Sequence, residues 1–83
     1  MIEGKTIILL GSRGLIGKNI EKSILEKKAN LISVDLNQTE SENDNILRLK
    51  ADITNSKSLK KIIGLSKKKF QKIDALINCS YPK

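Results

Sequence analysis

Three glycines recur at every third position near the amino terminus, where Gly11, Gly14 and Gly17 follow the apolar run of residues 6–10. Gly11 would permit a tight turn, Gly14 would let a pyrophosphate approach the backbone, and Gly17 would let a following helix pack closely. A helix that begins here offers unpaired N–H groups and its positive dipole end to phosphates. Surface turns also collect glycine, so the pattern needs support from its surroundings. The predicted phosphate-binding turn consists of Gly11, Ser12, Arg13, Gly14, Leu15, Ile16 and Gly17.

An acidic residue supports this interpretation. Asp35 ends the second apolar run, 18 residues after Gly17, where a carboxylate can accept hydrogen bonds from an adenosine ribose. The same carboxylate would repel a 2′-phosphate, which favours NAD over NADP. Arg13 has the opposite tendency, because a guanidinium beside the turn could pair with that phosphate. We give Asp35 more weight, since it acts directly on the ribose and Arg13 can equally be a solvent-exposed residue.

Short apolar runs predict the strands that must position these residues. They are rich in Ile, Leu and Val and occur at residues 6–10, 31–34, 46–49 and 73–77, as is typical of strands buried on both faces of a sheet. The polar segment of residues 37–45 is expected to be a loop.

Helical spacing of apolar residues predicts two amphipathic helices. The first runs from Leu15 to about Lys28 and has Glu21 among the charged residues between its apolar positions, which are Ile16, Ile20, Ile24 and Leu25. The second begins at a cap formed by Asn55 or Ser56 and ends near Phe70. Its expected inward residues are Leu59, Ile62, Ile63, Leu65 and Ser66.

The resulting order is strand, helix, strand, strand, helix, strand. Strands separated by helical crossovers indicate an α/β fold with right-handed connections. We therefore expect half of a doubly wound fold, with a four-stranded parallel sheet and flanking helices. A chain of 83 residues has room for one domain only, and the same reasoning treats residues 1–83 as a single, truncated nucleotide-binding unit.

Composition argues against several other classes of function. The net charge of +7 comes mainly from scattered lysines, and the only aromatic residues are Phe70 and Tyr81, whereas nucleic-acid binding favours arginines interleaved with aromatic residues. One cysteine and no histidine leave no plausible zinc site, so no metal ligand is assigned. The first apolar run is too short for a signal peptide or a membrane span, and we expect a cytoplasmic protein without membrane contact.

Together these residues resemble the short-chain dehydrogenase/reductase family over essentially the whole chain. The glycine spacing is similar to that of its extended, epimerase-like members, although Leu10 replaces their usual Thr. Ala51-Asp52-Ile53-Thr54 resembles the family's Asp-Val or Asp-Ile element after the third strand. The resemblance implies a partial Rossmann fold in which Asp52 and Ile53 contact adenine. The alternative for Asp52 is an ordinary turn and capping residue.

The end of the fourth strand carries a second likeness. Ile77-Asn78-Cys79-Ser80 resembles the family's Asn-Asn-Ala-Gly element but retains only the first Asn. The resemblance implies that Asn78 steadies the sheet beside the cofactor ribose. Tyr81-Pro82 is similar to dehydrogenases of surface-polysaccharide and nonulosonic-sugar pathways, a likeness that does not fix a substrate.

No catalytic residue is assigned. The family's proton-transfer pair is a Tyr followed four residues later by Lys, with a Ser upstream, and the chain ends before that region. Tyr81 and Lys83 have the wrong spacing. Without a histidine to serve as base, Cys79 is expected to be a small, buried apolar residue instead of a nucleophile.

The resemblance implies the NAD(P)-binding portion of an oxidoreductase that is inactive as this chain alone. Two alternatives remain open at this stage: a non-catalytic dinucleotide-binding or regulatory module, and a gene fragment without function. The fourth strand would leave an apolar, unpaired edge, which invites a second chain or self-association. The expected ligand is therefore a dinucleotide, with NAD favoured over NADP.

Overall fold

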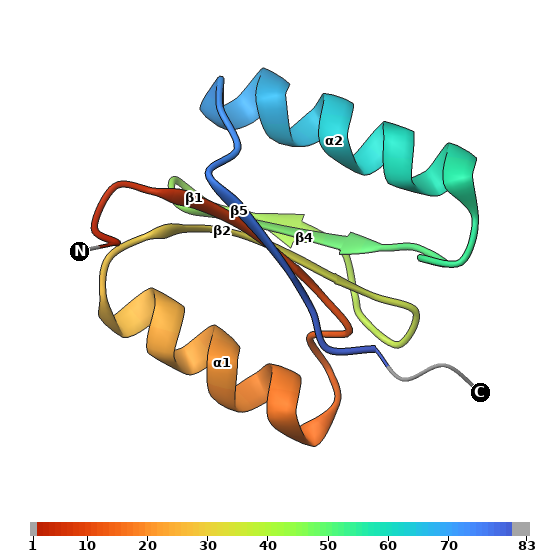
Figure 1. The fold of residues 1–83 in the computed structure, drawn as a ribbon, viewed down its shortest axis with the longest axis horizontal. Coiled ribbons are helices and arrows are strands. Elements are labelled where there is room, and N and C mark those ends of the chain that lie inside the picture. Colours follow the sequence, from red (N-terminus) through yellow and green to blue (C-terminus); the bar gives the residue numbers. More distant parts are fainter. Residues whose placement is uncertain (1, 81–83) are drawn as a thin grey trace.

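A parallel sheet with one helix on each face forms the centre of the molecule (Figure 1). A computed structural model describes residues 2–80. The elements are β1 (Thr6–Leu10), α1 (Leu15–Glu26), β2 (Asn30–Asp35), β3 (Ser41–Glu42), β4 (Ile46–Lys50), α2 (Ser56–Phe70) and β5 (Ala75–Asn78). The strands lie in the order β3-β4-β2-β1-β5, and β1, β2, β4 and β5 are mutually parallel. The predicted α/β class and partial Rossmann fold are confirmed.

The central strands are buried on both faces. Every residue of β1 is buried, because alternate side chains point toward opposite helices. One face packs against α2 through a cluster that includes Ile8, Ile32 and Ile62. The other face packs against α1 through Leu9 and Ile24, among others. Burial of the continuous apolar runs fixes β1 and β2 at the centre of the sheet.

A fifth strand is added to the four that the sequence predicts. Ser41 and Glu42 form β3, which pairs antiparallel with β4 inside the segment expected to be a loop. The Asn43 side chain accepts hydrogen bonds from the backbone of Asn45 and Ile46, which closes the connecting turn. Both residues of β3 are exposed, so no apolar alternation marks the strand in the sequence.

Three helical side chains differ from expectation in their burial. Ile16 is 50% exposed and Ile63 is 39% exposed, although both were expected to face inward. Ile16 lies in the first turn of α1, at the edge of the sheet, and Ile63 lies on the flank of α2 beside the buried Ile62. Glu21 is the reverse case, because it is only 8% exposed. Helix α1 also ends two residues early, at Glu26, and Lys28 has a positive φ of 61°.

Strand β5 begins at Ala75, two residues later than predicted. It pairs with β1, and within the described part of the chain no strand lies on its other side. Leu76 is 51% exposed there. The apolar edge expected from the sequence is therefore present, while association through it stays a prediction.

Candidate dinucleotide-binding site

The predicted site residues lie along one edge of the sheet. Parallel strands bring their carboxyl ends to the same edge, and the connections from β1 to α1 and from β4 to α2 lie on the same side of the sheet in Figure 1. The chain runs outward from β1 through β2 to β4, then returns as β5 on the other side of β1. Such a reversal of strand order is where doubly wound folds bind ligands.

The turn after β1 needs glycine at two positions. Gly11 has a φ of +79°, and a Cβ there would lie 2.7 Å from the backbone nitrogen of Ser80. A Cβ on Gly17 would overlap the carbonyl oxygen of Gly11. Packing of α1 against the turn, and of the turn against the end of β5, therefore excludes side chains at both places.

Gly14 differs from these two glycines. A Cβ there would meet only the carbonyl oxygen of Gly11, at 3.7 Å, which is an ordinary van der Waals distance. Its φ of −72° and ψ of 169° suit any residue. The fold itself therefore has room for a side chain at Gly14.

The amino terminus of α1 is open. Gly14 is the N-cap, no side chain accepts a hydrogen bond from the first turn, and that turn contains no acidic residue. The first N–H groups of a helix have no acceptor within the helix. Those of Leu15, Ile16 and Gly17 are therefore oriented to bind an anionic group. Leu15 is 81% exposed, so the side chains leave this end accessible.

Asp35 lies against the turn. Its Oδ2 accepts a hydrogen bond of 2.9 Å from the backbone nitrogen of Arg13, and its Oδ1 accepts one of 2.8 Å from Asn37. These bonds hold the carboxylate beside the open end of α1. Each carboxylate oxygen retains capacity for a further donor, so a ribose hydroxyl can still bind.

The Arg13 side chain is not simply solvent-exposed. Its Nη2 lies 2.6 Å from Glu21 Oε2, and the Arg48 Nη1 lies 2.9 Å from Glu21 Oε1. Helical periodicity predicts Glu21 to be one of the solvent-facing charges of α1, and no motif in the sequence selects Arg48. The expected exposure of Glu21 is wrong, because two guanidinium groups from the turn and from β4 compensate its burial.

The buried polar residues Ser12 and Ser33 complete this cluster. Ser33 Oγ lies 2.7 Å from both Ser12 Oγ and Glu21 Oε1. Gln38 donates hydrogen bonds to the backbone oxygens of Ser33 and Leu49. The Ser12 side chain therefore faces the interior. Its backbone nitrogen donates to Val34 and the residue is fully buried, so the structure gives Ser12 a role in supporting the turn instead of a direct contact surface. The polar Ser33 inside an apolar strand was the signal in the sequence that could have indicated the cluster.

Opposing influences act on the pKa of Glu21. Burial is the largest of them and raises the pKa, whereas the hydrogen bond with Ser33 and the guanidinium groups of Arg13 and Arg48 lower it. These contacts and the positive charge of Arg48 together outweigh burial, so the pKa lies below the ordinary value. Glu21 is therefore ionised at neutral pH and forms true ion pairs with the arginines.

Asp52 and Ile53 follow β4 at the same edge. Asp52 is exposed, and its Oδ1 accepts hydrogen bonds from the hydroxyl and the backbone nitrogen of Thr54. These bonds lower the pKa of Asp52. Ile53 is half-buried against the α2 side of the core. The contacts of Asp52 match its alternative role as a turn and capping residue, and its exposure leaves a further acceptor position open.

Asn78 ends β5, paired in register with Leu10. Its side-chain oxygen accepts hydrogen bonds from the backbone and the hydroxyl of Ser80, so the structure gives this side chain a local contact. The backbone of Cys79 donates to Leu10, and its side chain packs against the α1 side of the core. Tyr81, Pro82 and Lys83 lie outside the described residues.

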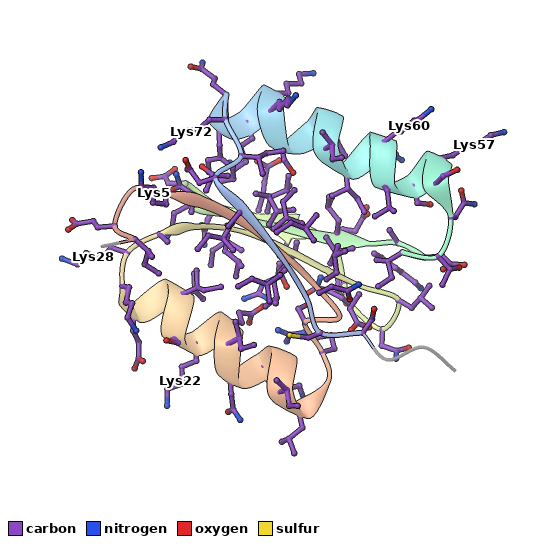
Figure 2. The ribbon with its side chains drawn as sticks, viewed as in Figure 1. Lys5, Lys22, Lys28, Lys57, Lys60 and Lys72 are labelled. Carbon is purple, nitrogen blue, oxygen red and sulfur yellow. The ribbon has the colours of Figure 1, made fainter. Side chains whose placement is uncertain are left out.

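The lysines are divided between the outer faces of the molecule. Lys22 on α1 points away from the sheet on one side, and Lys57 and Lys60 on α2 point away on the opposite side (Figure 2). Among residues 2–80, no three potential ligands of the His, Cys, Asp or Glu types gather around a common point. In the same range no helix has the length and apolar character needed to cross a membrane.

Solved structures with this fold define the class of protein. A short-chain dehydrogenase from Leptospira borgpetersenii, solved with bound NAD+, matches with a TM-score of 0.82 and 29% identity, over 98% of this chain and 33% of that one. A short-chain dehydrogenase/reductase variant from Serratia marcescens matches with a TM-score of 0.87 over 98% of this chain and 37% of that one. Its identity is 20%, so it shows the fold alone. The class is an oxidoreductase fold of the short-chain dehydrogenase type.

The family follows from the sequence itself. The profile of the NAD dependent epimerase/dehydratase family matches residues 7–82, and the chain belongs to this family. Post-translational flagellin modification protein A of Campylobacter coli is 39% identical over 92 aligned positions, which cover 99% of this chain and 36% of that protein. The chain thus spans about a third of the length of these relatives, and the resemblance stated from the motifs is confirmed.

Proposed function

We propose that this chain binds the adenosine diphosphate portion of NAD at the carboxyl edge of its sheet. The open end of α1 binds the pyrophosphate, and Asp35 accepts hydrogen bonds from the adenosine ribose. One observation carries this proposal: the hydrogen bond from the Arg13 backbone to Asp35. It brings a ribose acceptor next to a set of phosphate donors, as the adenosine diphosphate portion of a dinucleotide requires.

The adenine ring is assigned to the neighbouring surface. Leu36 follows Asp35 directly and is 55% exposed, so it presents apolar surface beside the carboxylate assigned to the ribose. Leu36 and Asp52 line the same surface cavity of about 390 Å³. The ring would contact Leu36 and Ile53, with Asp52 accepting a hydrogen bond from its amino group.

The chain's own residues supply binding and orientation in this proposal. When bound, the nicotinamide ring would supply hydride chemistry, and none of the residues described is assigned a catalytic role. The repulsion between Asp35 and a 2′-phosphate favours NAD over NADP. The similarity to the Leptospira borgpetersenii dehydrogenase solved with bound NAD+ supports a nicotinamide dinucleotide.

Thermal unfolding with and without millimolar NAD tests the proposal. A ligand that binds only the folded state raises the apparent Tm, by the equivalent of about 2.7 kcal/mol at a hundredfold excess over Kd. We expect a clear rise with NAD and a smaller one with NADP. A Tm that neither dinucleotide changes would contradict the proposal.

Asp35→Ala sharpens the test. Loss of a hydrogen bond to a charged acceptor should weaken NAD binding about tenfold and reduce the preference over NADP. Asp44→Ala is the matched control, because Asp44 is an exposed residue away from the strand ends that form the site. Calorimetric titration of both variants measures the effect. Equal NAD affinity in the two variants would remove Asp35 from the site.

A further inference from the structure

Two arginines converge on one buried carboxylate beneath the glycine-rich turn. Arg13 comes from the turn, Arg48 from β4 and Glu21 from the second turn of α1. The Glu21 side chain is 11% exposed, and those of Arg13 and Arg48 are 27% and 24% exposed. Ion pairs with this degree of shielding are weakened less by solvent and salt than pairs on the open surface. The cluster therefore holds the Arg13 guanidinium in a defined place.

The direction of the Arg13 side chain matters because the Arg13 backbone lies beside the proposed ribose site. Its backbone nitrogen donates to Asp35, so the residue starts beside the carboxylate assigned to the ribose. A 2′-phosphate on that ribose would lie next to the same backbone. An arginine near the ribose is the group that accommodates this phosphate in dinucleotide sites, where it can form paired hydrogen bonds. In this protein the side chain instead turns toward Glu21.

We propose that Glu21 determines cofactor selectivity by holding Arg13 in an ion pair away from the position of a 2′-phosphate. This inference rests on the proposed function and deepens it. Selectivity for NAD then has two sources: Asp35 repels the extra phosphate, and Glu21 removes the cation that would attract it.

Arg48 reinforces the arrangement and determines how Arg13 responds if the carboxylate is neutralised. It is held on β4 by hydrogen bonds to Glu21 and Gln38. If Glu21 loses its charge, the two guanidinium groups remain close together without an anion between them, and they repel each other. Arg48 belongs to a strand, whereas Arg13 belongs to a turn at the surface, so Arg13 is the residue that would move outward.

The test is a double-mutant cycle read by calorimetric titration with NAD+ and with NADP+ at one ionic strength. Glu21→Gln should strengthen NADP+ binding about tenfold, as expected for one charge-assisted pair, with NAD+ affinity nearly unchanged. Arg13→Gln alone should give no gain in NADP+ affinity, because the Arg13 side chain is already paired with Glu21. The double variant should return NADP+ affinity to that of the unaltered protein.

Glu26→Gln is the matched control, since it makes the same charge change at an exposed position of the same helix. This control distinguishes the release of Arg13 from the general increase in positive charge that any loss of a carboxylate causes. We expect Glu26→Gln to leave the ratio of NAD+ affinity to NADP+ affinity unchanged. Should Glu21→Gln fail to give a cooperative melt, Glu21→Asp replaces it. That variant withdraws the carboxylate by one methylene and should give a smaller gain in NADP+ affinity that also depends on Arg13.

Two results would overturn the inference: no gain in NADP+ affinity in the folded Glu21 variant, or a gain that persists when Arg13→Gln is added. In both cases NAD+ binding by the unaltered protein would still support the proposed function. Failure of the unaltered protein to bind NAD+ would instead overturn the proposed function, and the inference with it.

Discussion

The two helices begin in similar surroundings but differ in how the free N–H groups of their first turns are capped. Each follows a parallel strand at the carboxyl edge of the sheet. At α2 the Asn55 side chain accepts a 2.8 Å hydrogen bond from the backbone of Lys57. At α1 the N-cap is Gly14, which has no side chain to accept a hydrogen bond from the first turn. Helix α2 therefore satisfies one of its free donors with its own cap, whereas no side chain caps α1, and this difference is what the proposed ligand site depends on.

The glycines show the same contrast. Gly17 in α1 has no space for a Cβ, whereas the Cβ of an alanine at Gly64 in α2 would meet nothing within 4 Å. Both are glycines inside helices, where alanine is preferred by about 1 kcal/mol. The close approach of α1 to the turn thus requires glycine, and nothing in the packing of α2 does.

Substitution of these two glycines should produce the largest difference between the helices. Gly17→Val forces α1 away from the turn, because the new side chain overlaps Gly11 and Ser12. We expect a loss of about 3 kcal/mol or more in the free energy of unfolding, enough to unfold much of a chain this small. Gly64→Ala should stabilise the protein by about 0.5–1 kcal/mol. Urea unfolding measures both, and similar effects of the same sign would contradict the contrast.

Closing the open helix should separate stability from binding. Gly14→Asp supplies α1 with the side-chain cap that it lacks and adds a negative charge where the pyrophosphate is proposed to lie. We expect stability to rise by about 0.5 kcal/mol and NAD affinity to fall more than about tenfold through blocked donors and charge repulsion.

Thermal unfolding measures the stability of the Gly14→Asp variant, and calorimetric titration of the same sample measures its NAD affinity. A variant that gains stability and still binds NAD as well as the unaltered protein would show that the phosphates do not lie at α1. A loss of both would mean that the turn needs glycine at this position for its own geometry.

Much of this site follows from local pattern. The buried strand at residues 6–10 is a continuous apolar run, the glycine spacing sets the turn, and Asp35 stands where the next apolar run ends. Each of these features depends on residues that are neighbours in the sequence. The same is true of the Asn55 cap, which was one of two predicted cap residues.

The parts that sequence reasoning missed depend on distant partners or on no pattern at all. The burial of Glu21 is stabilised by Arg48, 27 positions away, and by Ser33 on another strand. Helical periodicity assigns any charged residue to the solvent and cannot represent such a pairing. Strand β3 consists of Ser41 and Glu42, both exposed, and forms because a hairpin turn brings them to the edge of β4.

Removal of the α2 cap should give the smallest effect, and it should lower stability without changing NAD affinity. Asn55→Ala leaves the Lys57 N–H without its acceptor, and we expect a loss of about 1 kcal/mol in the free energy of unfolding. NAD affinity should be unchanged, because the proposed site uses the donors of α1 and not the capped donor of α2. Urea unfolding and calorimetric titration on the one variant measure both quantities. If NAD affinity fell with the cap, the amino terminus of α2 would share in ligand binding, and the division between a closed helix and an open one would have to be abandoned.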